Sequence, residues 1–298
     1  MASAREMRLR IQSVKNIAQV TKALETVSAS KVRRSTNAYL AAKPYADKAW
    51  KLLVHLARQP GRSSTHPLLQ ERTKVNKLLV IIVTSDRGLS GAYNNNIIRH
   101  TLEHFSKIEQ PVSFVAVGRK GRDLLIRLRK NVIADFSGLP PAPTFADVSA
   151  IGRLIVDDFL KELYDQVYLA YTEYVSVLRQ DPVINKILPL DVVYSDEVNT
   201  LNATHPTHSV FTYEPDQSEI LDQIVPRFTA VQIYRCILSA AASEHAARMI
   251  AMRNATDNAQ ELMGLLQLEY NKARQQTITN EMLDIITGAE ALAKIRSA

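Results

Sequence analysis

Two glycine-containing turns are the first places in this sequence where chemistry could occur. One spans residues 85–91 and follows the apolar run 78–83, and the other spans residues 118–121. Turns at such places cradle phosphate groups in many α/β proteins. Neither turn has the spacing GxGxxG or GxxxxGKS/T, and Asp86 would place a carboxylate beside a bound phosphate. We therefore expect structural turns, and a nucleotide-dependent enzyme remains an alternative.

Two pairs of histidines are the candidate metal ligands. His100 and His104 lie one helical turn apart, whereas His205 and His208 lie in a polar, irregular segment. Zinc needs three or four ligands in fixed geometry, and neither pair has a third ligand nearby, so we expect surface histidines. The single cysteine, Cys236, lies in an apolar helical context that is typical of a buried, inert thiol. We expect no metal, no cofactor and no catalytic residue.

The ends of the chain lack the residues that interrupt helices. Glycine is absent from residues 1–60, and proline is absent from residues 1–43 and 227–298. This distribution predicts one long helix over residues 4–57 and another over residues 227–296. Each helix needs a partner, so we expect the two to pack antiparallel as a coiled coil.

Apolar residues predict which side of the first helix is buried. They form two overlapping stripes, one of Met7, Ile11, Val14 and Ala18 and one of Ile17, Val20, Leu24 and Val27. Proline removes a backbone donor and crowds the preceding turn, so Pro44 should bend or interrupt this helix. In the same way, Pro226 should interrupt or restart a short helical stretch that begins at Asp216.

Between the two helices the pattern changes to alternating strands and helices. The expected strands cover residues 78–83, 112–117, 132–136 and 167–177, and the expected helices cover residues 94–108, 119–130 and 147–164, the last capped by Asp147. This alternation predicts an open, mostly parallel, Rossmann-like α/β sheet. The expected domains are an N-terminal coiled-coil helix (1–58), a central α/β domain (74–198) and a C-terminal coiled-coil helix (212–298).

The positive charge is concentrated in the first helix. Residues 1–60 contain 12 Lys and Arg against 3 Asp and Glu, whereas the rest of the chain has 25 against 27. The candidate binding cations are Arg8, Lys15, Lys22, Lys31, Arg33 and Arg34. A basic helix can bind nucleic acid, an anionic lipid surface or an acidic protein. Few aromatic side chains lie among these cations, which weakens the nucleic-acid alternative.

The composition also limits how the chain could meet a membrane. Its 298 residues are 46% apolar and 22% charged, which is typical of a folded protein. The longest apolar run, residues 78–83, is far shorter than the roughly 20 residues that span a bilayer. The first residues do not fit a signal or transit peptide. We therefore expect an intracellular protein that reaches a membrane only through partners.

Four segments carry a specific resemblance. Residues 11–31 resemble the amino-terminal helix of the gamma subunit of F-type ATP synthases, residues 247–258 and 270–281 resemble its carboxy-terminal signature, and residues 85–89 match its central domain. The resemblance covers essentially the whole chain. It implies a non-catalytic rotor shaft that couples ion flow to ATP synthesis or hydrolysis.

The resemblance also implies partners, a location and further site residues. The partners would be the alpha and beta subunits of the catalytic head, the epsilon subunit and the c-subunit ring, with no nucleic acid. The location would be the cytoplasmic face of the bacterial plasma membrane, reached through the complex. A polar catch with a beta subunit would include Gln275, Thr279 and Glu281, with Arg248 nearby on the same helix. The cations of the first helix would face acidic loops of the beta subunits.

Overall fold

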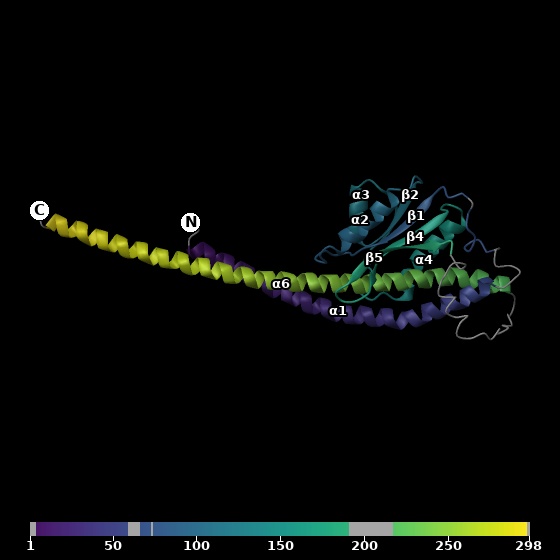
Figure 1. The fold of residues 1–298 in the computed structure, drawn as a ribbon, viewed down its shortest axis with the longest axis horizontal. Helices are drawn as coiled ribbons and strands as arrows, with labels where there is room; N and C mark the ends of the chain where they lie inside the picture. Colours follow the sequence, from purple (N-terminus) through teal and green to yellow (C-terminus); the bar gives the residue numbers. More distant parts are fainter. Residues whose placement is uncertain (1–3, 59–65, 73, 191–216, 297–298) are drawn as a thin grey trace. The chain divides into compact units, whose positions relative to one another are not determined.

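A computed structural model of the chain describes residues 4–58, 66–72, 74–190 and 217–296 (Figure 1). The chain divides into two compact units, one formed by residues 28–248 and one by residues 1–27 with 249–298. The two long helices, α1 (Ala4–Arg58) and α6 (Gln217–Arg296), each contribute to both units. The predicted long helices at the two ends of the chain are therefore confirmed.

The unit of residues 28–248 contains a five-stranded sheet. Its elements, in chain order, are β1 (Leu78–Val83), α2 (Tyr93–Phe105), β2 (Val112–Val117), α3 (Arg119–Arg127), β3 (Asn131–Phe136), α4 (Phe145–Leu160), β4 (Gln166–Tyr174) and β5 (Gln180–Leu188). The strand order is β3-β2-β1-β4-β5, and all neighbouring pairs are parallel except β4 with β5. The mostly parallel α/β sheet is confirmed. The antiparallel edge strand β5 was not predicted.

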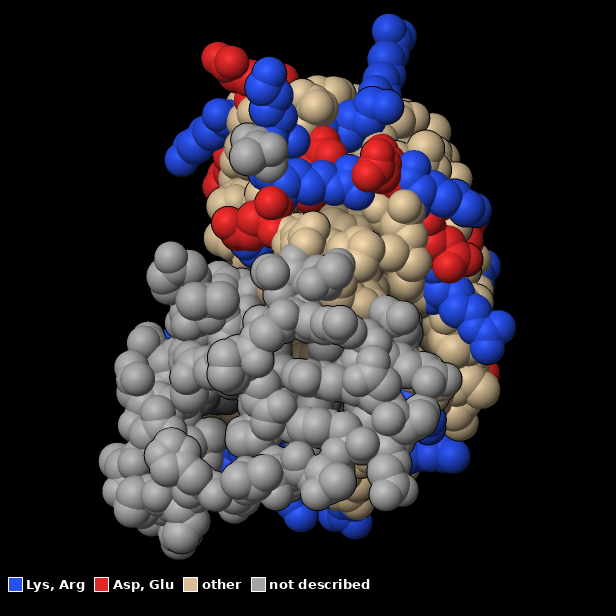
Figure 2. Space-filling model, turned by 90° about the vertical axis from the view of Figure 1, so that its right-hand side faces the viewer, with Lys and Arg blue, Asp and Glu red and all other residues tan. Residues whose placement is uncertain are grey.

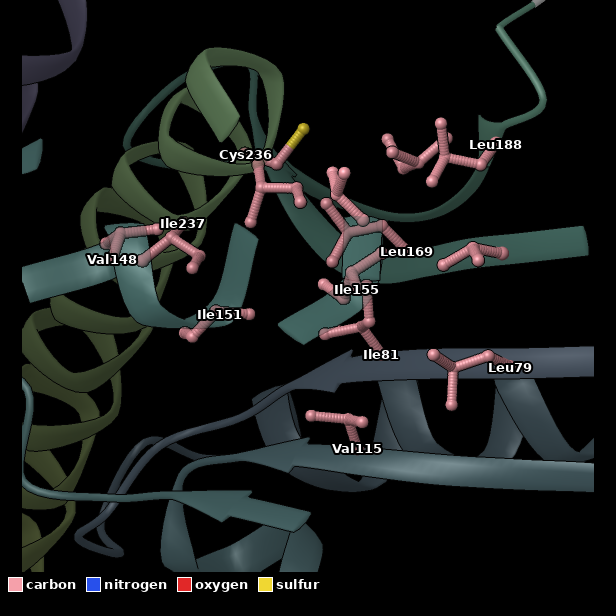
Figure 3. Close-up of a cluster of buried hydrophobic side chains, with 14 of the residues drawn as sticks. Leu79, Ile81, Val115, Val148, Ile151, Ile155, Leu169, Leu188, Cys236 and Ile237 are labelled. Atoms are coloured by element: carbon pink, nitrogen blue, oxygen red, sulfur yellow. The ribbon is translucent and has the colours of Figure 1, made fainter. Parts of the chain in front are cut away.

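Both faces of the sheet are covered, which is why β1 is one continuous apolar run. Leu79 and Ile81 point into a core formed with α4 and α6, which Figure 3 shows with Ile151, Ile155 and Ile237. The alternate residues of β1 pack against α2 and α3 on the other face. Alternating side chains along a strand therefore supply both cores.

The two long helices pack antiparallel in the unit of residues 28–248. The ring of Trp50 stacks on Phe228 at 5.4 Å, and the carboxylate of Asp47 lies 3.4 Å from Arg235. As the number rises along α1, the number of the partner residue falls along α6. In the other unit, the hydroxyls of Thr21 and Thr256 share a buried hydrogen bond of 2.8 Å.

Only one of the two predicted stripes on α1 is buried. The buried positions of the helix recur at intervals of three, four or seven residues, and they are Ala18, Thr21, Ser28, Val32, Ser35, Tyr39, Ala46 and Leu53. Met7, Ile11 and Val14 continue this stripe as half-buried residues. The second stripe was wrong at Ile17, Val20 and Val27, which are more than half exposed, whereas its fourth member, Leu24, is half-buried. A repeat of 3.5 residues keeps a single seam against the partner helix, and here small and hydroxyl-bearing residues alternate in that seam with a few larger apolar ones such as Val32 and Leu53.

Two expected helix interruptions and one expected helix cap differ from the structure. Helix α1 continues through Pro44 and α6 continues through Pro226, so neither proline ends a helix. Buried neighbours, among them Ala46 and Phe228, hold each helix in place by tertiary packing. Asp147 is the third residue of α4 and not its cap. It forms a capping box with the true cap, Thr144, whose hydroxyl and amide both donate to the Asp147 carboxylate at 2.7 Å.

One face of the molecule carries charges of both signs. On the face that Figure 2 shows, lysine and arginine side chains lie among aspartates and glutamates.

Among the described helices, none has a stretch that is both long and apolar enough to cross a lipid bilayer. The predicted division of the chain at residues 58, 74, 198 and 212 stays a prediction, because the two compact units cut across both long helices.

Candidate functional site

The turn after β1 carries its own carboxylate where a phosphate could bind. Asp86 Oδ1 accepts the backbone N–H of Arg119 at 3.0 Å, and Oδ2 accepts the N–H of Gly138 at 2.8 Å. In addition, the Thr84 hydroxyl accepts the N–H of Gly121 at 2.9 Å. The first amides of α3 are therefore satisfied within the protein itself, those of Arg119 and Gly121 by side chains and that of Lys120 by the carbonyl of Ser85 at 3.0 Å. This arrangement supports the expectation that residues 85–91 and 118–121 are structural turns.

Hydrogen bonds and backbone conformation fix the shape of the turn. The side chain of Asn94 accepts the Ser85 N–H at 2.9 Å and donates to the Ser85 hydroxyl at 2.8 Å. Leu89 and Gly91 adopt left-handed conformations, with φ of 64° and 58°. The Ser85 hydroxyl also donates to the carbonyl of Arg87 at 2.6 Å. The turn is thus held in a form that leaves backbone carbonyls available to α6.

Arg248 of α6 donates hydrogen bonds to two of those carbonyls. Its Nε donates to the carbonyl of Gly88 and one Nη to the carbonyl of Arg87, both at 3.2 Å. The same Nη forms an ion pair with Glu244 at 2.8 Å, and the Arg248 side chain is only 12% exposed. A planar guanidinium with five N–H groups suits such a bridge between helix and turn. We call the cluster of Arg248, Glu244, His245 and the turn residues 87–88 the joint.

His245 completes the joint as a neutral, buried imidazole. An Nη of Arg248 lies 3.3 Å from His245 Nδ1, and because arginine can only donate, Nδ1 must be the acceptor. The ring also forms a hydrogen bond with the backbone of Pro141, which as a proline offers only its carbonyl. Burial, together with the positive charges of Arg248 and Lys31, lowers the pKa of His245 to about 4.

Glu244 lies on the same turn of α6. Burial raises the pKa of its carboxyl, although Arg248 acts in the opposite direction through charge and hydrogen bonding. Sequence reasoning singled out neither Glu244 nor His245. The signal that could have found them is a Glu, His and Arg at positions 244, 245 and 248 of an otherwise alanine-rich segment, since residues three and four apart share a helix face.

The predicted cations of α1 fall in both compact units. Arg8, Lys15 and Lys22 belong to one unit, and Lys31, Arg33 and Arg34 belong to the other. All are exposed except Lys31, which is half-buried and lines a cavity beside the joint. Lys22 pairs with Glu25 at 3.1 Å. No ion pair joins Arg33 or Arg34 to an acid in the part of the chain that the structure describes.

The predicted catch residues lie on an exposed part of α6. Every residue from 274 to 289 is exposed, which includes Gln275, Thr279 and Glu281. The Thr279 hydroxyl donates to the Gln275 carbonyl at 2.9 Å, but no side-chain contact joins the three residues. The same stretch exposes large apolar side chains, namely Ile278, Met282, Leu283, Ile285 and Ile286. Apolar surface of this extent is typical of an interface with another protein.

The candidate metal and thiol sites have an ordinary structural explanation. His100 and His104 are exposed residues of α2. His205 and His208 lie outside the described residues. Across the described ranges, no group of three or more His, Cys, Asp or Glu is placed to hold a metal ion. Cys236 is buried without a disulfide, as predicted, and burial raises the pKa of its thiol to about 12.

Comparison with known proteins finds the same family along nearly the whole chain. A model of the ATP synthase family matches residues 3–292. The chain is 43% identical to the ATP synthase gamma chain of Dehalococcoides mccartyi strain CBDB1, over 98% of this chain and 100% of that one. It is 42% identical to the ATP synthase gamma chain of Roseiflexus castenholzii, over 99% of this chain and 100% of that one.

Solved structures share the fold. One is a chain in the OSCP/F1/c-ring structure of the Euglena gracilis mitochondrial ATP synthase, with a TM-score of 0.69, 19% identity and coverage of 99% of this chain and 96% of that one. Another is a chain in the central stalk/c-ring structure of the Tetrahymena thermophila mitochondrial ATP synthase, with a TM-score of 0.60, 23% identity and coverage of 79% and 99%. With both long helices, the mostly parallel sheet and full-length relatives in agreement, the chain belongs to the family of ATP synthase gamma chains.

Proposed function

We propose that this chain is the central rotor shaft of an F-type ATP synthase. In this role it transmits torque between an ion-driven membrane ring and the alpha/beta catalytic head, and it is itself non-catalytic. The observation that carries the proposal is the exposed stretch of residues 274–289 in a member of the gamma chain family. Its large apolar side chains have no cover within the described residues, and the inside of a ring of other subunits would provide one.

The partner contacts follow from charge and exposure. We assign Arg8, Lys15, Lys22, Lys31, Arg33 and Arg34 to contacts with acidic surfaces of the head. Lys31 is half-buried and the other five are exposed. Exposed cations attract such surfaces over a distance and release them easily, as a turning shaft requires. Gln275, Thr279 and Glu281 would form a polar catch with a beta subunit. Arg248 is largely buried, so its contribution to the contacts with the head would be indirect: it holds α6 to the turn after β1.

The remaining partners and the location extend the same proposal. The α/β domain would contact the c-subunit ring and the epsilon subunit, and the similar solved structures include a central stalk with a c-ring and a rotor of mitochondrial ATP synthases. The chain would be a peripheral protein at the cytoplasmic face of a bacterial plasma membrane, bound there through the complex. ATP synthesis and ion transport are then properties of the assembly.

Assembly is the direct test of the shaft. The chain should co-purify with alpha and beta subunits, and it should change their ATPase activity when added back. If the chain neither joins the head nor alters its activity, the proposal is wrong. Salt-sensitive retention on DNA without affinity for the head would favour the nucleic-acid alternative.

Charge reversal tests the cationic contacts. Arg33→Glu with Arg34→Glu should reduce ATP synthesis in reconstituted vesicles by on the order of tenfold, because attraction becomes like-charge repulsion. Both residues are exposed, so the free energy of unfolding should change by no more than about 0.5 kcal/mol. Lys43→Glu with Lys48→Glu is a control with the same charge change at exposed positions of the same helix. Equal synthesis by all three proteins would refute the role of Arg33 and Arg34.

A further inference from the structure

A cavity of about 250 Å³ lies at the carboxyl ends of the three parallel strands β1, β2 and β3. The last residues of these strands, Val83, Val117 and Phe136, line it together with Ile237 and Ala240 of α6. In open α/β sheets this edge is where ligands bind. The joint forms part of the wall, so a ligand here would contact both the sheet and the long helices.

The charged residues of the cavity are out of balance. Lys31, Arg87, Arg119 and Arg248 line it, against the two carboxylates of Asp86 and Glu244. The formal excess is therefore two positive charges, with His245 neutral at pH 7. These residues come from α1, the turn after β1, α3 and α6, so the excess arises only in the folded chain.

Both carboxylates are already committed to neighbours. Asp86 accepts two backbone N–H groups and lies 3.7 Å from the guanidinium of Arg119. Glu244 pairs with Arg248 at 2.8 Å and faces Lys31 as well, so one carboxylate serves two cations. Arg87 has no ion pair with any acid in the described ranges. Lys31 and Arg87 are thus the cations that a bound anion would neutralise.

The volume limits the size of that anion. At ~30 Å³ per molecule of liquid water, the cavity has room for roughly eight waters. It is smaller than the roughly 300 to 1,000 Å³ of pockets that bind drug-sized ligands. A phosphate group with a short substituent fits such a space, and the small volume favours it over a whole nucleotide. In addition, the first turn of α3 is already occupied by Asp86, which leaves the side of Lys31 and Arg87 for the ligand.

We propose that this cavity is a binding site for a small phosphate-bearing dianion, with Lys31 and Arg87 as its charged ligands. The bound anion would tie α1 to the turn after β1, next to the contacts that already tie this turn to α6. The site would therefore stiffen the joint and raise the thermal stability of the chain by linkage. The proposal concerns binding by the isolated chain, so it can fail while the rotor proposal holds.

Titration calorimetry on the full chain at constant ionic strength tests the site. The probes are inorganic phosphate, glycerol 3-phosphate as a monoester, sulfate as a tetrahedral dianion, and ADP. Saturable binding of phosphate or the monoester with a Kd of about 1 mM or below supports the site, and the tighter of the two identifies the source of the phosphate group. Binding of ADP ten times tighter than of either would refute the size argument. No saturable binding of any probe would refute the site.

Two substitutions and a matched control localise the binding. Lys31→Gln and Arg87→Gln should each weaken it at least tenfold, because each removes a charge-assisted contact. Arg87→Lys should retain most of the affinity, which separates loss of charge from loss of structure. Lys43→Gln removes an exposed cation of α1 that does not line the cavity, so it should bind as the unsubstituted chain does. Equal weakening by Lys43→Gln, or none by the two site variants, would overturn the proposal.

Discussion

Replacement of His245 by glutamine should make the fold less sensitive to mild acid. The imidazole is 5% exposed and faces the cations Arg248 and Lys31 and the backbone of Pro141. Its ordinary pKa of 6.5 falls to about 4 in the folded chain. The unfolded chain therefore takes up the proton first as the pH falls below about 6.5, which lowers the stability of the fold.

The size of the effect follows from these two pKa values. Between pH 7 and pH 5 the unfolded chain becomes almost fully protonated at this residue, whereas the folded chain stays mostly neutral. At 1.36 kcal/mol for each pKa unit of difference, the loss over this range is about 2 kcal/mol. Glu244 works in the opposite direction, because its raised pKa favours proton uptake by the folded chain. Since both proteins contain Glu244, its effect cancels in the comparison.

Urea unfolding at pH 7 and pH 5 measures this difference. Between the two pH values, the free energy of unfolding of the original chain should fall by about 2 kcal/mol more than that of His245→Gln. His245→Asn is a second variant in case the first does not fold. His104→Gln, at an exposed position of α2, controls for the loss of an imidazole and should follow the original chain. Parallel pH dependence of His245→Gln and the original chain would refute a buried, neutral His245.

Substitutions at three further places test the helix packing and the buried hydrogen bonds. Thr21→Val removes a buried hydrogen bond between two hydroxyls and should lower the free energy of unfolding by about 1 kcal/mol. When Thr256→Val is added, the further decrease should be smaller than the decrease that Thr256→Val causes alone, which a double-mutant cycle in urea measures. Gly152→Ala places a Cβ 2.9 Å from an alanine of α6 and should destabilise the chain by about 1–3 kcal/mol in thermal unfolding. Gly264→Ala is the control, because nothing lies within 4 Å of its new Cβ, and it should leave the stability unchanged or raise it by up to ~1 kcal/mol. Asp165→Ala strands two backbone N–H groups and an arginine and should lower the free energy of unfolding by about 2 kcal/mol; no change in the melting temperature would contradict this.

Several features could be predicted from the sequence because they depend on neighbours along the chain. The absence of proline from residues 1–43 and 227–298, with no glycine in residues 1–60, predicts the long helices, and the apolar run of β1 predicts a strand that is covered on both faces. The Asp86 turn is also a local feature, since its carboxylate and the spacing of its glycines argue against a phosphate loop. The edge strand β5 was missed, because a half-exposed strand that contains Pro182 has no clear alternation.

Only the tertiary structure determined which side chains of those helices and strands are buried and which contact one another. An α-helix offers several overlapping stripes, and only the surface of the partner helix selects one, so Ala18 and Thr21 are buried while Ile17 and Val20 are exposed. Arg248 illustrates the same point, because its position on the helix is evident from the sequence while its contacts with residues 87 and 88 join segments some 160 positions apart. Burial and charge at such contacts depend on distances in space. Periodicity along the chain determines the elements, and the packing of distant surfaces determines what each side chain does.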